Sequence, residues 1–175
     1  MAVNLSTWNL AHSDIDVTVQ AMLLEHNVPA DRLELEITEN AMMQNPERAH
    51  AILDRLAALG VRLTVDDYGT GFSSLAYLKN MPVDQIKIDR SFVSDMLEDE
   101  NDAVIVRSTI DLAHNLGMRV VAEGVTDAEI WDLLEMLGCD AAQGYFIAHP
   151  MSAAALEHWL CSDLRKETRQ NGRRA

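Results

Sequence analysis

Short runs with alternating apolar and polar residues recur along the chain. In each run the apolar side chains fall at every second position, which is the spacing of a β-strand with one buried face. The expected strands cover residues 3–6, 33–38, 61–67, 85–92, 118–125 and 141–148. Glycine and other turn-forming residues flank most of these runs, which favours strands over fragments of longer helices.

Segments with apolar residues three and four positions apart lie between the expected strands. The clearest helix covers residues 46–59, where Asn45 is the expected N-cap, Pro46 is the first helical residue and Gly60 ends the helix. Two further helices are expected over residues 102–116 and 127–137. Strands that alternate with helices predict right-handed βαβ units and a parallel sheet.

The predicted strands have one apolar face and one polar face. In residues 33–38, for example, Leu35 and Ile37 share one face while Glu34 and Glu36 share the other. The polar side chains expected near the strand ends are Asn4, Glu36, Asp66, Lys87, Glu123 and Gln143. An open sheet with helices on both faces has continuous apolar strands instead, so this pattern argues against a doubly wound fold.

A polar face shared by six strands is costly unless its groups pair with one another or bind ions. The interior of a β/α barrel provides that enclosure, and the strand C-termini of such barrels meet at the catalytic end. We therefore predict an α/β fold, a modified TIM-type (β/α) barrel with about six of its eight βα units in this chain. A sheet with one face open to solvent is the alternative. The expected barrel is either the C-terminal part of a longer barrel or is completed by a second copy.

The net charge of −14 over 175 residues limits the partners that the chain can bind. Five of the basic residues lie in residues 165–175, so the rest of the chain is more acidic than the whole. A nucleic-acid polymer is therefore not expected as a partner. A small phosphate-bearing ligand remains compatible if divalent cations neutralise the local negative charge. We expect one domain over residues 1–164, followed by a polar, disordered basic tail over residues 165–175.

The cysteines and the hydropathy pattern indicate the compartment. Cys139 and Cys161 have no metal-ligand spacing, and no apolar run is as long as a membrane-spanning helix requires. A soluble, cytoplasmic protein with reduced thiols is expected, although a longer parent protein can be tethered to a membrane.

Two adjacent carboxylates, Asp66 and Asp67, follow an apolar strand and precede Gly69. Their charges repel, so such a pair is favourable where hard divalent cations lie between oxygen ligands. Two metal ions about 3.5–4 Å apart, with Asp66 bridging them, would satisfy both carboxylates. Taken alone, acidic residues before a glycine-rich turn are more often turn formers, and the metal site depends on the other polar residues at the strand ends.

Five motifs together resemble those of the EAL-domain cyclic di-GMP phosphodiesterases. In chain order they are VNLS, ELEITEN, VDDYGTGFSSLAYLKNMPVDQIKIDRSFV, VVAEGV and GCDAAQGYFIAHP, between about residues 2 and 151. The resemblance implies a modified TIM barrel. It also implies hydrolysis of cyclic di-GMP to linear pGpG by a water activated by two Mg²⁺ or Mn²⁺ ions, which lowers cyclic di-GMP in bacterial signalling.

The resemblance also assigns roles to individual residues. The implied metal ligands are Asn4, Glu36, Asp66, Asp67 and Glu123, and the implied catalytic residues are Lys87, Glu123 and Asp66. Lys87 matches the lysine that contacts the catalytic water. Gln143 matches an active-site glutamine, and Asp89 and Glu39 are grouped with it as binding residues. Glu39 matches the glutamate that steadies the loop after the aspartate pair, a loop linked in the family to dimerisation and substrate binding.

Two departures from the family pattern bear on activity. The Glu-x-Leu motif that supplies a further metal ligand is expected about 55–60 residues upstream of Asn4 and is absent here. Thr126 stands where active members usually have a second glutamate. Thr126 and Glu129 instead form the pattern of a helix capping box, with Thr126 as the N-cap. Slower turnover is the expected consequence.

Two alternatives to a phosphodiesterase follow from these departures. One is a non-catalytic or weakly active cyclic di-GMP-binding receptor or regulatory module. The other is an interaction module that neither binds nor hydrolyses the dinucleotide. For the enzyme we expect a homodimer and, in a longer parent chain, a sensory or GGDEF-type domain.

Overall fold

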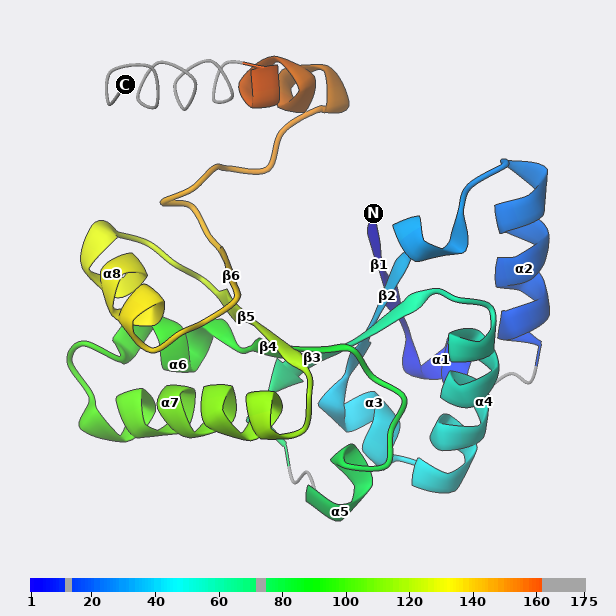
Figure 1. The fold of residues 1–175 in the computed structure, drawn as a ribbon, viewed down its shortest axis with the longest axis horizontal. Coiled ribbons are helices and arrows are strands. Elements are labelled where there is room, and N and C mark those ends of the chain that lie inside the picture. The colour runs from blue at the N-terminus through cyan, green and yellow to red at the C-terminus, as the bar shows by residue number, and fades with distance from the viewer. Residues whose placement is uncertain (12–13, 72–74, 162–175) are drawn as a thin grey trace.

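The computed structural model describes residues 1–11, 14–71 and 75–161 (Figure 1). Six parallel strands form one sheet in the order in which they occur in the chain. The strands are β1 (Ala2–Leu5), β2 (Glu34–Thr38), β3 (Arg62–Tyr68), β4 (Gln85–Ile88), β5 (Arg119–Glu123) and β6 (Ala141–Gln143). All six predicted strands are confirmed, and so is the α/β class.

Helices connect successive strands, as the parallel order requires. They are α1 (Thr7–Ala11), α2 (Ile15–Glu25), the 3₁₀ helix η1 (Ala30–Arg32), α3 (Glu39–Met43), α4 (Pro46–Ala58), α5 (Leu75–Leu78), α6 (Arg90–Asp95), α7 (Glu100–Asn115) and α8 (Ala128–Met136). Residues 153–161 are also helical. None of the helices among the described residues is long and apolar enough to cross a membrane.

The apolar face of the sheet packs against the helices that cover its outer side. Leu35, Leu63 and Ile86 on the strands are buried together with Leu53 of α4 and Ile110 of α7 in one hydrophobic core. Helix α4 begins as predicted, because the Asn45 side chain accepts a hydrogen bond from the Arg48 N–H (3.2 Å). The strand alternation therefore selects the outer face, and the amphipathic helices cover it.

The opposite face of the sheet is polar, as predicted. The Lys87 and Thr64 side chains on this face are buried, so it is not simply a face left to solvent. Six sequential parallel strands with helices on one side are the arrangement of a TIM-type barrel. Among the described residues β1 and β6 are not paired with each other, and the sheet is therefore open between these two strands (Figure 1).

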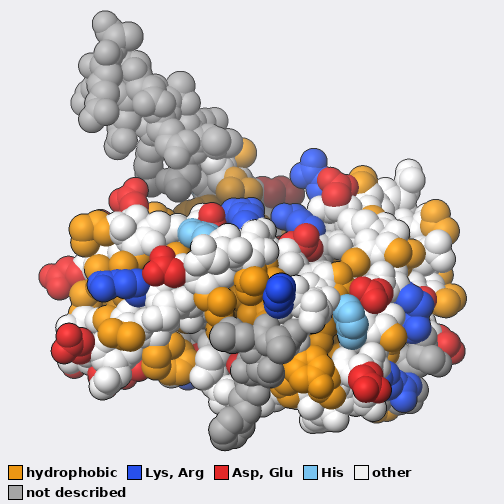
Figure 2. Space-filling view, turned by 60° about the horizontal axis from the view of Figure 1, so that its bottom comes forward, with side chains coloured by type: hydrophobic (Ala, Val, Ile, Leu, Met, Phe, Trp, Pro, Cys, Tyr) orange, Lys and Arg blue, Asp and Glu red, His pale blue; other side chains and the backbone are white. Residues whose placement is uncertain are grey.

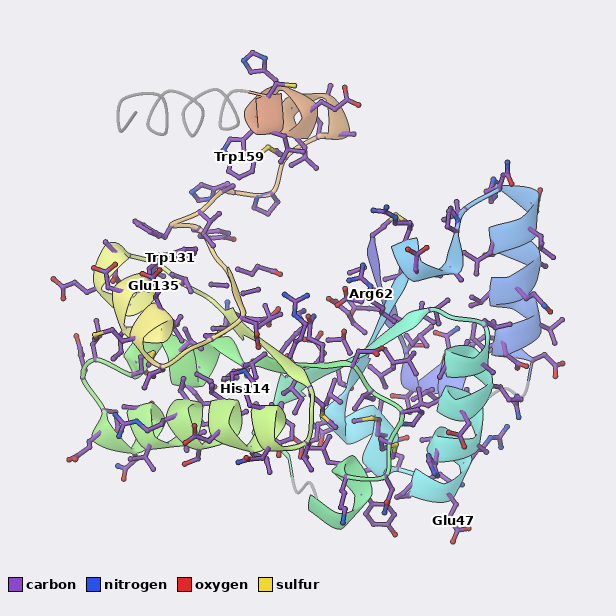
Figure 3. All side chains as sticks on the ribbon, in the orientation of Figure 1. Glu47, Arg62, His114, Trp131, Glu135 and Trp159 are labelled. Atoms are coloured by element: carbon purple, nitrogen blue, oxygen red, sulfur yellow. The ribbon has the colours of Figure 1, made fainter. Side chains whose placement is uncertain are left out.

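Two aspartates use the same interaction to set the relative position of neighbouring strands. Asp84, just before β4, accepts a hydrogen bond from the Leu63 N–H of β3 at 2.8 Å. Asp140, just before β6, accepts one from the Val120 N–H of β5, also at 2.8 Å. His114 at the end of α7 (Figure 3) lies 2.9 Å from Asp140, which ties that helix to the same point. The side chains replace ladder hydrogen bonds where the strands begin.

We expect Asp84→Ala to lower the free energy of unfolding by about 1–3 kcal/mol, because it leaves the buried Leu63 N–H without its partner. Urea unfolding of the two proteins measures this difference. Asp31→Ala is the control, since the Asp31 side chain is 72% exposed and should change stability little. Equal unfolding free energies for the Asp84 variant and the wild type would contradict the assigned role.

Three boundary predictions are wrong. The strand expected over 85–92 ends at Ile88, because Asp89 accepts a hydrogen bond from the Ser91 N–H and starts α6. The strand expected over 141–148 ends at Gln143. The N-cap of α8 is Asp127, which accepts from two backbone N–H groups, whereas the Thr126 hydroxyl donates to the Asp127 carboxylate. The tail predicted over residues 165–175 lies outside the described residues.

Candidate metal centre and active site

Lys87 on β4 lies at the centre of the polar face. Its side chain is only 7% exposed, and its Nζ lies 3.1 Å from Glu36 Oε1, 3.0 Å from Asp66 Oδ1 and 2.6 Å from Glu123 Oε1. These three carboxylates come from β2, β3 and β5. The fold therefore gathers residues spread over almost 90 positions of the sequence around one ammonium group.

The charges in this cluster determine the protonation of Lys87 and Glu123. Burial acts to lower the pKa of Lys87, but hydrogen bonds and attraction to Glu123 and Asp66 outweigh it and raise the pKa. Burial raises the pKa of Glu123, and repulsion from Asp66 and Glu36 adds to this effect. The hydrogen bond from Lys87 and its positive charge lower the pKa, but they offset the increase only in part. Lys87 is consequently a fixed positive charge at neutral pH.

Asp67 joins two of these carboxylates, Asp66 and Glu123, beside Lys87. Asp66, Asp67 and Glu123 each offer a carboxylate oxygen, and these oxygens lie within 4.8 Å of one another. A regular strand would point the side chains of Asp66 and Asp67 to opposite faces. Here the register of β3 against β4 shifts between Val65 and Tyr68, and Asp67 has a left-handed backbone with φ of 53°. This irregularity brings both members of the pair to one site.

Asp67, like Glu123, carries an electrostatic cost in this arrangement. Burial, followed by repulsion from Asp66 and Asp89, raises the pKa of Asp67. A carboxylate held among other carboxylates in this way is stabilised by a bound cation. Oxygen ligands without histidine or cysteine are the donors that Mg²⁺ and Mn²⁺ prefer, so the residues present fit such ions.

Asp89 and Glu39, which the sequence grouped with the binding residues, support the loops around the cluster. Asp89 caps α6; burial acts to raise its pKa, but hydrogen bonds from Ser91 outweigh burial and lower it. Glu39 begins α3 and is 1% exposed, and its Oε2 accepts a hydrogen bond from the Gly69 N–H at 2.9 Å. Glu39 therefore holds the loop that follows the aspartate pair. A direct binding role for either residue stays a prediction.

Asn4 and Gln143 lie at the two ends of the polar face. Asn4 on β1 is in register with Glu36, and Gln143 on β6 is in register with Glu123, so each shares a face with one member of the cluster. Both side chains are exposed, at the strands whose outer edges are open. The structure brings them to the correct end and face of the sheet, and their contacts with metal and substrate stay predictions.

A cavity of about 800 Å³ extends from Glu123 and Gln143 along the ends of β4, β5 and β6. Sequence reasoning assigned no chemistry to Arg90, Tyr145 or His149, which also line it. The rings of Tyr145 and His149 stack with centroids 4.3 Å apart. All three lie in the motifs quoted above, and Arg90 and Tyr145 come two residues after a strand end, which is the signal that points to them. The cavity has the size of a pocket for a small organic ligand.

Residues 1–150 match the sequence model of the EAL domain family. The chain belongs to the EAL-domain family. The resemblance drawn from the five motifs is thereby confirmed. The EAL domain also agrees with the parallel α/β architecture, which the strand pattern predicts without reference to any family.

The EAL domain of this chain is similar to that of MucR, the bifunctional diguanylate cyclase/cyclic di-GMP phosphodiesterase of Pseudomonas aeruginosa. The two are 40% identical over 156 residues, which cover 89% of this chain and 23% of MucR. This chain thus spans less than a quarter of the length of that relative.

Two solved structures show the same fold with ligands. The phosphodiesterase of PaMucR in complex with c-di-GMP superposes with a TM-score of 0.86 at 40% identity, over 89% of this chain and 63% of that one. The manganese/cy-diGMP complex of BlrP1 from Klebsiella pneumoniae has a TM-score of 0.76 at 31% identity, over 82% of this chain and 37% of that one. The BlrP1 structure therefore contains a divalent metal together with the dinucleotide.

Proposed function

We propose that this EAL domain hydrolyses cyclic di-GMP to linear pGpG and so lowers this second messenger in bacterial signalling. The convergence of Asp66, Asp67 and Glu123 beside Lys87 is the observation that carries the proposal. Family membership and the complexes of related domains with the dinucleotide support it.

The acidic cluster would hold two divalent cations, Mg²⁺ or Mn²⁺. Asp66, Asp67 and Glu123 would be the main ligands, with Glu36 and Asn4 completing the oxygen shell. When bound, such ions offset the negative charge of the phosphodiester and make water a better nucleophile. The other contributions to the reaction come from this chain's own side chains.

Lys87 would act as a fixed donor and not as a base. Because its pKa is raised, its Nζ stays protonated. Its three N–H donors face Glu36, Asp66 and Glu123 in this structure, and one of them would turn to the attacking water or to a phosphoryl oxygen once those carboxylates hold cations. The water oxygen would add to phosphorus as one P–O3′ bond breaks. Of the two protons of the water, one would end on the departing 3′ oxygen and the other would pass to solvent, which leaves a phosphate monoester and a 3′ hydroxyl. The 800 Å³ cavity beside Glu123 and Gln143 would hold the rest of the dinucleotide.

A cyclic di-GMP receptor without turnover is the second candidate. Thr126 lines the 800 Å³ cavity in place of the family glutamate, and its hydroxyl is engaged by Asp127, so this position adds no carboxylate to the site. The retained acidic cluster favours the enzyme, since a receptor does not need groups that activate water.

We further propose a cytoplasmic location, a homodimer and a sensory or cyclase domain in a longer parent chain; the bifunctional MucR supports the last of these.

We expect the purified chain to convert cyclic di-GMP to pGpG with Mn²⁺ or Mg²⁺ and Asp66→Ala to abolish conversion, because Asp66 belongs to both the metal cluster and the Lys87 network. Chromatography of the products measures turnover, and equilibrium dialysis with labelled dinucleotide measures binding. Asp132→Ala, at an exposed position of α8, is the matched control.

The two measurements separate the candidates. Metal-dependent binding without product identifies a receptor, whereas a folded chain that neither binds nor hydrolyses the dinucleotide overturns both readings. Product formed equally by Asp66→Ala would overturn the assigned site.

A further inference from the structure

Helix α2 is apolar on two opposite sides. In Figure 2 hydrophobic side chains are scattered among charged ones over the face in view, so a single exposed apolar residue is ordinary. On α2, however, Val19 is buried toward the core, while Val17 and Leu24 on the other side are 61% and 76% exposed. Ala21, also exposed, lies between them, so Val17, Ala21 and Leu24 form one stripe at spacings of four and three residues. A helix that is apolar all round is normally buried all round, so this stripe indicates a surface that another element covers.

The helix over residues 153–161 stands apart from the sheet and from α2 of its own chain (Figure 1). Every residue in it except Trp159 is exposed. Ala153, Leu156 and Leu160 share one side of this helix at spacings of three and four residues, and the two leucines are 44% and 46% exposed. Most of the stability of a protein helix comes from packing of its apolar side and not from helix propensity. This helix therefore requires a partner surface.

The charges that accompany the two helices are complementary. Residues 14–25 contain Asp14, Asp16 and Glu25 and no lysine or arginine, and they stay net acidic although Arg55 of α4 pairs with Asp16 at 3.1 Å. Residues 165–175, which follow the 153–161 helix in the sequence, contain five lysines or arginines and one glutamate. Docking of this helix on α2 would bring a basic segment to an acidic one, whereas an anionic membrane would repel a chain of net charge −14.

We propose that α2 is the docking surface for the 153–161 helix of a second copy of this chain. The two helices lie antiparallel, so that Leu160 meets Val17 and the basic segment follows beside the two aspartates at the start of α2. Two copies related by a two-fold axis each donate this helix to the other, which forms two identical contacts and closes the dimer. Leu156 also lines the 800 Å³ cavity, so the contact would fix one wall of that cavity. The proposal assigns surfaces to the homodimer and does not depend on hydrolysis.

Sedimentation velocity of the full chain, in chelator and without dinucleotide, measures the association. We expect a monomer–dimer equilibrium with a dissociation constant on the order of 10–100 μM, as suits an interface of small area. Val17→Lys and Leu160→Glu should each raise this constant at least about tenfold, because each buries a charge against an apolar stripe. Both positions are exposed in the monomer, so both variants should fold. Met136→Glu, at a 77% exposed position of α8, is the matched control and should dimerise like the wild type.

Two further measurements identify the surfaces that meet. The double variant Val17→Lys/Leu160→Glu places opposite charges across each docked helix, so it should dimerise more tightly than either single variant. If α2 paired with α2 of the second copy instead, the introduced lysines would face each other and the double variant would gain nothing. Amide hydrogen exchange reports on the helix itself. Exchange in residues 153–161 should slow as the wild-type concentration rises, and it should not slow in Val17→Lys.

Several results would overturn the proposal. They are a wild type that stays monomeric, single variants that dimerise as the wild type does, and a double variant that dimerises no more tightly than the single ones. Vesicles that contain phosphatidylserine test the other partner class. If they bind the wild type but not Leu160→Glu while the chain stays monomeric, the helix belongs on a lipid surface and the proposal is wrong. Because neither metal nor dinucleotide is present, an inactive enzyme would leave these outcomes unchanged.

Discussion

Replacing Lys87 with methionine is expected to stop hydrolysis and to lower the melting temperature of the metal-free protein by on the order of 10 °C. Methionine keeps a long side chain but removes the charge that pairs with three carboxylates. Removing one partner of a buried ion pair costs about 3–5 kcal/mol, because the remaining charges lose their compensation. Thermal unfolding at pH 7 with a chelator measures the difference, and product chromatography measures turnover.

The pH dependence of the Lys87→Met effect has a definite sign. The folded-state pKa of Lys87 is raised, so its stabilising contribution is present below its ordinary pKa of 10.5 and is lost as the pH rises through the folded value. At acid pH the carboxylates become protonated and the difference between variant and wild type should shrink. Mn²⁺ should raise the melting temperature of the variant more than that of the wild type, because it replaces the missing positive charge.

Lys79→Met, at an exposed position, is the control for Lys87→Met and should change neither melting temperature nor turnover appreciably. A Lys87 variant with wild-type stability in chelator would show that the ion-pair network contributes nothing to the fold. Retained turnover would remove Lys87 from the proposed chemistry.

Asp67→Asn is expected to reduce metal-dependent hydrolysis by at least about 100-fold and to stabilise the metal-free protein. Even groups that only orient metal ligands cost 10–100-fold when removed, and Asp67 is a proposed ligand itself. The pKa of Asp67 is raised by burial and by neighbouring carboxylates, so the ionised form costs the folded state free energy. Asparagine removes that charge and suits the left-handed backbone at φ of 53°.

Asp67→Asn should therefore raise the melting temperature of the metal-free protein, measured in chelator. Because the raised pKa makes stability fall as the pH rises, the gain should be present at neutral pH and disappear in acid. Asp132→Asn on α8 provides the comparison for a change of charge alone. A lower melting temperature for Asp67→Asn in chelator, or full activity with Mn²⁺, would contradict the assigned role.

The sequence predicted much of the fold because its signals are local. Alternation of apolar and polar residues located all six strands, and Asn45 marked the start of α4. Predictions failed where a local pattern allowed two solutions. Thr126 and Asp127 are both good N-caps, and only the folded backbone at the end of β5 selects Asp127. Asp89 continues the alternation of β4, but its side chain caps α6 instead.

The candidate site, like the fold, was predicted from the sequence only in part. Strand periodicity by itself places Glu36, Lys87 and Glu123 on one face at the strand ends, because side-chain direction in a strand follows from position. The distances from Lys87 Nζ to its three carboxylates depend on how β2, β3 and β5 lie beside β4. The hydrogen bond between Glu39 and Gly69 and the 800 Å³ cavity likewise depend on contacts between segments far apart in sequence.

The sequence by itself determined the parallel sheet, its polar face and the residue types of an oxygen-ligand metal site, since each follows from the order and periodicity of side chains. Only the tertiary structure decided that Asp66 and Asp67 reach the same site. A regular strand would separate them, and the register shift and left-handed residue that bring them together arise from the packing of β3 between its neighbours. Backbone irregularities of this kind depend on long-range contacts, which local patterns do not encode.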